Sequence, residues 1–340
     1  MTERPVGHLW TFPLRQWLRA AAMTAAAGVA GCGGGGGSAP DRPLFMAGTL
    51  GTTLGKLHEP RAVAVEPSSG RFYVVDRSGR IQLFDADGKA LFEWRLPESA
   101  QGQPVGLTLD HDGTLLVNDS HYHRILRYAA DGSRILETWG TEGTGPGQFT
   151  FGRDVVVDSK SFVYAGDYGG LNDRIQKFTA HGEFVLEWGG VGEGPGQFQR
   201  PQGMAVERRG DQETLLVADS GNHRIQRFTL DGRFVDSLGK LGRGSGELRF
   251  PYSVAVDADG WMYVCEWGNN RIQRFRGDGE PAGTWGAAGR QAGELATPWD
   301  VAVGPEGRLY VADYGNHRVV VFRWPASVVA VRASASEARR

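Results

Sequence analysis

One short sequence pattern occurs six times along this chain. Its clearest copies read ADSGNHRIQRF at residues 218–228 and ADYGNHRVVVF at residues 312–322. The arginine that the copies share recurs roughly every 44–50 residues, and a fixed period of this size indicates a closed ring or a stacked array of repeats. The six arginines are Arg80, Arg124, Arg174, Arg224, Arg271 and Arg318. Residues that recur in every copy should stabilise the repeat, whereas individual chemistry should lie where the copies differ.

Each copy reads as four short β-strands. In the copy at residues 251–286, β-forming runs at 253–256, 261–265, 271–275 and 281–285 are separated by Asp-, Asn- and Gly-rich turns. Four antiparallel strands per repeat are typical of one blade of a β-propeller. We therefore predict an all-β fold, a six-bladed β-propeller of four-stranded antiparallel blades. The blades are expected to begin near Pro60, Pro104, Gly152, Pro201, Pro251 and Pro298.

The last blade needs a strand from elsewhere, because its copy contains three clear strands. Residues 44–48 and residues 327–331 are both candidates for its outer strand. The N-terminal segment is favoured because the stretch from Gly48 to Pro60 has the length of the linkers between later blades. An N-terminal strand would close the ring and protect a sheet edge that would otherwise invite aggregation.

The repeat resembles the NHL repeat. The resemblance rests on Asp-x-x-Asn-x-Arg-Ile, preceded by a Val/Tyr-rich strand and followed by Phe-x-x-x-Gly, and it covers residues 44–322. Glu266 replaces the aspartate in blade five, and blade one is one residue short and lacks the asparagine.

The N-terminus resembles that of a bacterial lipoprotein. Residues 1–31 combine a basic flank with a short Ala-rich apolar run, as in a secretion signal. They end just before Cys32, the expected lipidation site, and residues 32–43 form a Gly/Ser-rich tether. We expect a lipid-anchored protein of the cell envelope, at the outer membrane facing the periplasm. Residues 323–340 are expected to be a loose tail.

The recurring acid and arginine of each copy are interpreted as structural pairs. A short turn should bring carboxylate and guanidinium together in a bidentate contact. The pairs are Asp76 with Arg80, Asp119 with Arg124, Asp167 with Arg174, Asp219 with Arg224, Glu266 with Arg271, and Asp313 with Arg318. A carboxylate ring for Ca²⁺ is the less favoured alternative, because each acid has its own arginine.

Histidines precede the arginine in alternate blades, at His123, His223 and His317. They are interpreted as exposed loop residues rather than as a threefold zinc site, since loops of alternate blades are separated by the channel. We predict no bound metal and no cofactor, and Cys265 is expected to be a small core residue.

The copies differ most in two loops that face the same end of the ring. Aromatic residues gather there on blades three, five and six, together with a few charges, and such a surface is a plausible binding cleft. The candidate ligand-binding residues are Arg61, Arg153, Asp154, Tyr168, Tyr252, Trp267, Trp299, Asp300 and Tyr314.

Three functions are compatible with these features. The favoured hypothesis is a non-catalytic binding module that recognises a protein, peptide or carbohydrate-like ligand at the channel mouth. The alternative is an extracytoplasmic metal-dependent lyase or hydrolase, since similar propellers include peptide-amidating and streptogramin-opening lyases. Those families imply a metal and histidines at the channel, and the first strands of this chain carry no histidine. RNA binding is disfavoured by the formal net charge of -2.

Overall fold

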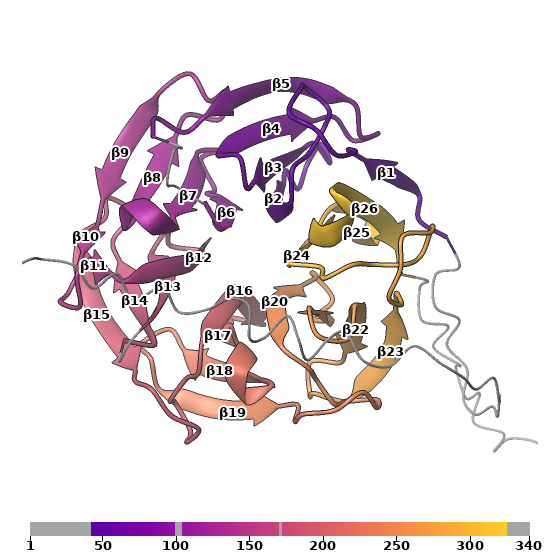
Figure 1. Cartoon of the computed structure of the whole chain (residues 1–340). Helices are drawn as coiled ribbons and strands as arrows, with labels where there is room; N and C mark the ends of the chain where they lie inside the picture. Colours follow the sequence, from indigo (N-terminus) through magenta and orange to yellow (C-terminus); the bar gives the residue numbers. More distant parts are fainter. Residues whose placement is uncertain (1–41, 99–103, 170–171, 325–340) are drawn as a thin grey trace, which may run out of the picture. The chain divides into compact units, whose positions relative to one another are not determined.

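Six four-stranded sheets form a closed ring around a central channel in a computed structural model of the chain (Figure 1). The structure describes residues 42–98, 104–169 and 172–324. Within these ranges the predicted all-β, six-bladed propeller is confirmed. In every blade the first strand lies at the channel and is called the inner strand below.

Each blade is an antiparallel sheet whose strands follow one another in the chain. Blades one to three comprise β2 (Pro60–Val65), β3 (Phe72–Asp76), β4 (Arg80–Phe84) and β5 (Ala90–Arg95); β6 (Gly106–Leu109), β7 (Leu115–Asp119), β8 (Arg124–Tyr128) and β9 (Ile135–Trp139); and β12 (Phe151–Val157), β13 (Val163–Tyr168), β14 (Arg174–Phe178) and β15 (Phe184–Gly189). Blades four to six comprise β16 (Pro201–Arg209), β17 (Gln212–Asp219), β18 (Arg224–Thr229) and β19 (Phe234–Leu238); β20 (Pro251–Val256), β21 (Met262–Glu266), β22 (Arg271–Phe275) and β23 (Pro281–Trp285); and β24 (Asp300–Val303), β25 (Arg308–Asp313), β26 (Arg318–Arg323) and β1 (Phe45–Ala47). A short parallel pair, β10 (Thr141–Glu142) with β11 (Gln148–Phe149), lies in the linker before blade three.

The hydrophobic core lies between neighbouring blades. Successive side chains of a strand point to opposite faces, so each blade contributes to two interblade layers. In blade one, Val63 and Val74 pack toward blade six, whereas Ala62 and Val75 pack toward blade two. Burial on both faces explains why the inner strands read as nearly continuous apolar runs.

The N-terminal strand closes the ring, as the linker length predicts. β1 pairs antiparallel with β26, with Phe45 opposite Val321 and Ala47 opposite Val319. Ala47 is buried in the layer between blades six and one, together with Leu57 and Phe72. The first and last described strands therefore share one sheet, which removes an open edge.

The recurring acid and arginine form an ion pair in every blade, although not in the bidentate form that we expected. In blade four, Arg224 Nε lies 2.8 Å from Asp219 Oδ2. The other guanidinium nitrogens donate to the carbonyl oxygens of Glu193, Gly194 and Gln197 in the preceding linker. The arginine thus joins its own strand to the linker between blades. Equivalent pairs span 2.5–3.6 Å in the other blades.

Two of the three alternating histidines, His223 and His317, also have a structural role, which corrects their interpretation as simple exposed loop residues. His223 and His317 are half-buried, and each Nδ1 accepts a hydrogen bond from a backbone N–H of the next blade's linker, at Phe250 and Glu59. Both histidines adopt φ near +57°, a left-handed conformation in which histidine is enriched among residues with a side chain. Asn270 takes the same place in blade five and accepts from Thr297 N–H. These side chains connect neighbouring blades.

The C-terminal boundary differs from the predicted one. Arg323 still belongs to β26, and Trp324 packs in the layer between blades five and six. The predicted signal at 1–31, the lipidation site Cys32, residues 33–41 of the tether and residues 325–340 of the tail lie outside the described residues. Within the described ranges no helix has the length and apolar character needed to cross a bilayer.

Candidate functional site

Two aspartates lie at the axis of the ring among small residues. The equivalent position, near the start of each inner strand, holds Ala62, Gly106, Asp154, Gly203, Ser253 or Asp300. Backbones approach closely here, because a Cβ on Gly106 would lie only 2.8 Å from the Asp154 Cα. A Cβ on Gly203 would lie 2.7 Å from the Ser253 Cα. The small residues therefore leave space for two carboxylates, one from blade three and one from blade six.

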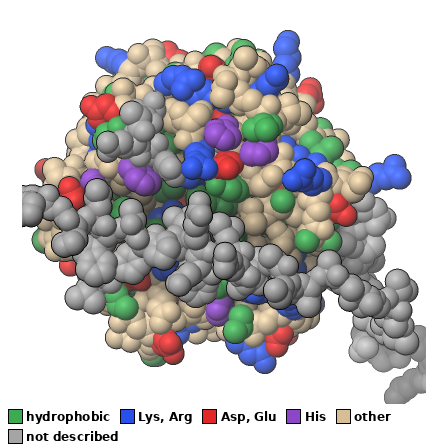
Figure 2. Space-filling view, viewed as in Figure 1, with side chains coloured by type: hydrophobic (Ala, Val, Ile, Leu, Met, Phe, Trp, Pro, Cys, Tyr) green, Lys and Arg blue, Asp and Glu red, His purple; other side chains and the backbone are tan. Residues whose placement is uncertain are grey.

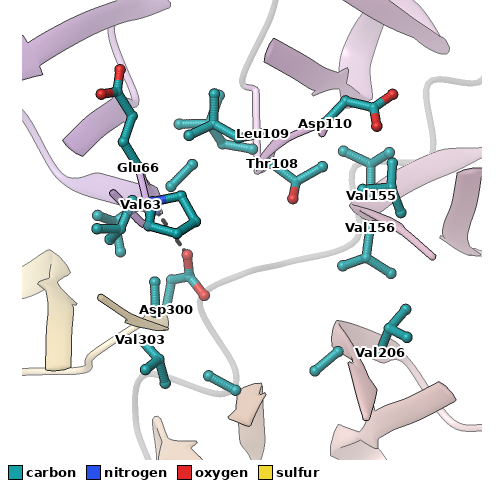
Figure 3. Close-up of a pocket in the computed structure, with 18 of the residues that line it drawn as sticks. Val63, Glu66, Thr108, Leu109, Asp110, Val155, Val156, Val206, Asp300 and Val303 are labelled. Atoms are coloured by element: carbon teal, nitrogen blue, oxygen red, sulfur yellow. Dashed lines mark hydrogen bonds between the residues drawn. The ribbon is translucent and has the colours of Figure 1, made fainter. Parts of the chain in front are cut away.

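Each carboxylate connects its own inner strand to that of the next blade. Asp300 Oδ2 accepts from Val63 N–H at 2.8 Å, a contact drawn in Figure 3, and its Oδ1 accepts from the Ser253 hydroxyl at 2.6 Å. Asp154 Oδ2 accepts from Met204 N–H at 2.7 Å, and its Oδ1 accepts from Val155 N–H at 2.9 Å. These bonds fix the orientation of both carboxyl groups relative to the channel.

Both aspartates have raised pKa values. Burial is the main cause, and it raises the pKa of Asp154 to about 7, with a further increase from the negative charge of Asp300. Burial raises the pKa of Asp300 to about 6, against the lowering effect of its bonds from Ser253, Val63 and Val301. Near neutral pH the pair can therefore hold one proton between two interacting carboxyl groups. Such a pair can supply a general acid and a general base.

A cavity of about 900 Å³ extends along the inner strands from this pair (Figure 3). Its walls are formed by Val, Ala and Leu side chains of all six inner strands, and it continues past their C-terminal ends to Glu66 and Asp110. A volume of this size is typical of sites for small organic ligands. Asp154 and Asp300 lie at one end of it.

On the side of the aspartate pair opposite the large cavity, the channel narrows to an opening lined by large side chains. This opening is called the channel mouth below. Its walls are Arg61, Arg153, Gln202, Tyr252 and Trp299, and the free space between them is about 20 Å³. That space is close to the minimum that holds one water molecule. The carboxyl groups are therefore open to the large cavity and nearly closed off at the mouth. Basic and histidine side chains also gather around the hollow centre of the face shown in Figure 2.

The structure brings most of the predicted ligand-binding residues together at this mouth. Trp299 stacks on Tyr314 with ring centroids 4.7 Å apart, and it lies 5.5 Å from Tyr252. Tyr252 in turn stacks on Trp267 at 5.7 Å. Tyr168 lies under Arg153. The aromatic residues contact one another and cover the channel, so Asp154 and Asp300 are the predicted residues that line the large cavity.

Two residues of this site were not predicted. Ser253 hydrogen bonds to Asp300, and buried Gln202 hydrogen bonds to Arg153. Both stand near the start of an inner strand, Gln202 in β16 and Ser253 in β20, at positions where the copies differ, and a polar residue at such a position was the signal that could have identified them.

A metal would not fit the residues present. Among residues 42–98, 104–169 and 172–324, no three His, Cys, Asp or Glu side chains converge as a ligand set. The oxygens of Asp154 and Asp300 already accept N–H or O–H donors, and no histidine accompanies them at the axis. We therefore derive no chemistry through a metal.

Two family models match the sequence. The model described as the SMP-30/Gluconolactonase/LRE-like region matches residues 154–296, and the NHL repeat model matches residues 295–322. Parts of this six-bladed propeller are therefore similar to the NHL repeat and to the SMP-30/gluconolactonase-like region. No curated protein matches the sequence.

Solved structures with this fold include several enzymes. A gluconolactonase from Xanthomonas campestris has a TM-score of 0.58 and 15% identity, covering 84% of this chain and 97% of its own. A streptogramin B lyase has a TM-score of 0.57 and 14% identity, covering 82% and 96%. Virginiamycin B lyase from Staphylococcus aureus has a TM-score of 0.54 and 16% identity, covering 78% and 94%. At these identities the similarity establishes the fold alone.

These findings correct the favoured functional hypothesis. A non-catalytic binding module was expected because no familiar catalytic motif stands out in the sequence. The match to the gluconolactonase-like model and the lyase and lactonase neighbours favour the alternative, a hydrolase or lyase. Asp154 and Asp300 were predicted as ligand-binding residues, but their pairing was not predicted, because they come from blades three and six and are far apart in sequence.

Proposed function

We propose that this protein is a hydrolase or lyase that cleaves an ester, such as a lactone, at the mouth-side end of the channel cavity. Asp154 and Asp300 would act as the acid–base pair. The observation that carries the proposal is the pair of carboxyl groups with pKa values raised to about 7 and about 6, facing a cavity of about 900 Å³. The lactonase and lyase names among the structural neighbours support the choice of an ester bond.

Hydrolysis would use both protonation states of the pair. The ionised carboxylate takes a proton from water, and the water oxygen bonds to the ester carbonyl carbon. The carbon–oxygen bond to the alcohol then breaks, and the protonated carboxyl group gives its proton to the departing oxygen. The products are an acid and an alcohol, which remain joined when the substrate is a lactone.

Elimination would use the same two groups differently. The ionised carboxylate removes a proton from the carbon next to the one that bears the ester oxygen. The electron pair forms a carbon–carbon double bond, and the alkyl carbon–oxygen bond breaks. The departing carboxylate takes a proton from the acid partner or from solvent. No water is consumed, so the two reactions differ in their products.

The experiment is a turnover assay on a panel of lactones, linear esters and cyclic depsipeptides in ¹⁸O-labelled water. Hydrolysis transfers ¹⁸O to the product acid, whereas elimination yields an unlabelled acid and an alkene. We expect Asp154→Asn to lower kcat by about 10²–10⁴-fold, the usual contribution of a general acid or base. The matched control is Asp158→Asn, at a buried aspartate outside the channel that accepts the Tyr164 hydroxyl and backbone N–H groups. Equal rates for Asp154→Asn and the wild-type protein, or no turnover of any ester by the wild-type protein, would contradict the proposal.

A further inference from the structure

The guanidinium group of Arg153 lies at the channel mouth near two aromatic rings. Its central carbon lies 5.4 Å from the Tyr168 ring centroid and 5.3 Å from that of Trp299. One of its N–H groups donates to Gln202 Oε1, and the Gln202 side chain is itself buried, at 2% exposure. A planar guanidinium fixed in this way loses little further freedom when it binds a planar or tetrahedral oxyanion.

Other positive groups lie close to Arg153. Arg61 lies over the same Trp299 ring, at 4.8 Å. The pKa of Arg61 is lowered to about 10, mainly by burial; Tyr314 acts to raise it, and the neighbouring charge of Arg153 acts to lower it. The pKa of His121 is lowered by burial and then by Arg61, His123 and Arg153. These mutual effects show that positive groups repel one another across the mouth.

The two arginines could instead serve as counter-charges for Asp154 and Asp300 beneath them. Arg153 does favour the ionised form of Asp154. However, with pKa values of about 7 and about 6 the aspartate pair carries between one and two negative charges at pH 7, and the nearby Glu59, which accepts from the Tyr314 hydroxyl, is paired with Arg77. Two arginines remain charged at that pH. An excess of positive charge therefore remains at the channel mouth.

We propose that the rim of the channel mouth, outside its free space of about 20 Å³, is an anion-binding site, in which the partly exposed Arg153 binds a carboxylate or phosphate group of a ligand. Gln202 holds the guanidinium in position, the Trp299 and Tyr168 rings support its faces, and Arg61 adds attraction. Bidentate binding of such oxyanions is the preferred use of arginine. The site shares Asp154 and Asp300 with the end of the large cavity, and its test measures anion binding rather than ester turnover, so failure of one proposal can be told from failure of the other.

Calorimetric titration of the full chain with sodium acetate and with inorganic phosphate tests the site. We expect saturable binding of at least one probe, and tighter binding of acetate or of phosphate identifies which group the natural ligand carries. Arg153→Gln should weaken binding at least tenfold. Arg134→Gln, at an exposed arginine in the turn before β9, is the matched control and should bind as the wild-type protein does.

A second variant guards against a simple loss of folding. Gln202→Glu keeps the size of the side chain and offers Arg153 a carboxylate from within the protein. We expect this variant to retain the wild-type melting temperature within a few degrees and to lose binding of both probes. Unchanged affinity in Arg153→Gln or in Gln202→Glu, or no binding of either probe to the wild-type protein, would overturn the proposal.

Discussion

At the scale of residues, Asp154 links the site to the stability of the fold. Its folded-state pKa of about 7 exceeds the ordinary value of 3.8, so the folded chain binds this proton more tightly than the unfolded chain does. The contribution of Asp154 to the free energy of unfolding is therefore fully present at low pH, and it is lost as pH rises from about 4 to about 7. Asp154→Asn keeps an oxygen acceptor for Met204 N–H and removes the buried charge.

We predict that Asp154→Asn raises the Tm relative to the wild-type protein more at pH 8 than at pH 5. The difference should be several degrees, since 1 kcal/mol shifts the Tm of a domain of more than 150 residues by roughly 2–4 °C. Thermal unfolding of both proteins at the two pH values measures it. Asp158→Asn provides the control at an aspartate outside the channel. A difference in Tm that is the same at both pH values would show that the Asp154 charge does not destabilise the fold.

Residue identities at the site could be predicted only in part. Asp154 and Asp300 are candidates because they interrupt a series of small residues in the aligned copies. Their raised pKa values were not predictable, because both depend on burial and that of Asp154 depends also on the charge of Asp300 across the axis. The roles of His223 and His317 were also missed, since their backbone partners belong to the next blade.

At the scale of elements, the period-two pattern and the turn residues were sufficient to predict the blades. The N-terminal strand β1 was predictable from linker length, because each blade-to-blade connection has nearly the same geometry. Its two faces differ in the structure. Ala47 is 2% exposed and packs between blades, whereas Met46 is 45% exposed on the outside. The end of β26 was less predictable, because the contacts that bury Trp324 come from blade five.

We predict that Ala47→Asp destabilises the ring by several kcal/mol, because it places an unpaired carboxylate in an apolar layer. Leu44→Asp, at a side chain 52% exposed just before the same strand, is the control and should change stability by about 0.5 kcal/mol or less. Denaturant unfolding of both variants measures the difference. Equal stability of the two variants would mean that β1 does not close the last blade as described.

At the scale of the whole molecule, the repeat determines the ring, and the ring determines which residues meet at its axis. Blades three and six face each other across the channel, and this brings together two aspartates that are 146 positions apart by residue number. The function was predicted wrongly because sequence motifs record neighbours along a chain and not neighbours across an axis. The large cavity and the positive mouth meet at the two aspartates, so the two proposals are tested by different measurements, ester turnover for the cavity and anion binding for the mouth.

The pH dependence of kcat/KM for an ester substrate tests the central claim most directly. Catalysis by one ionised and one protonated carboxyl group predicts a bell-shaped profile, with limbs near pH 6 and pH 7 that belong to the coupled pair. Asp300→Asn removes one of the two ionisable groups, so one limb of the pH profile of the residual kcat/KM should disappear. A flat wild-type profile between pH 5 and pH 8, or an unchanged bell in Asp300→Asn, would contradict acid–base catalysis by Asp154 and Asp300.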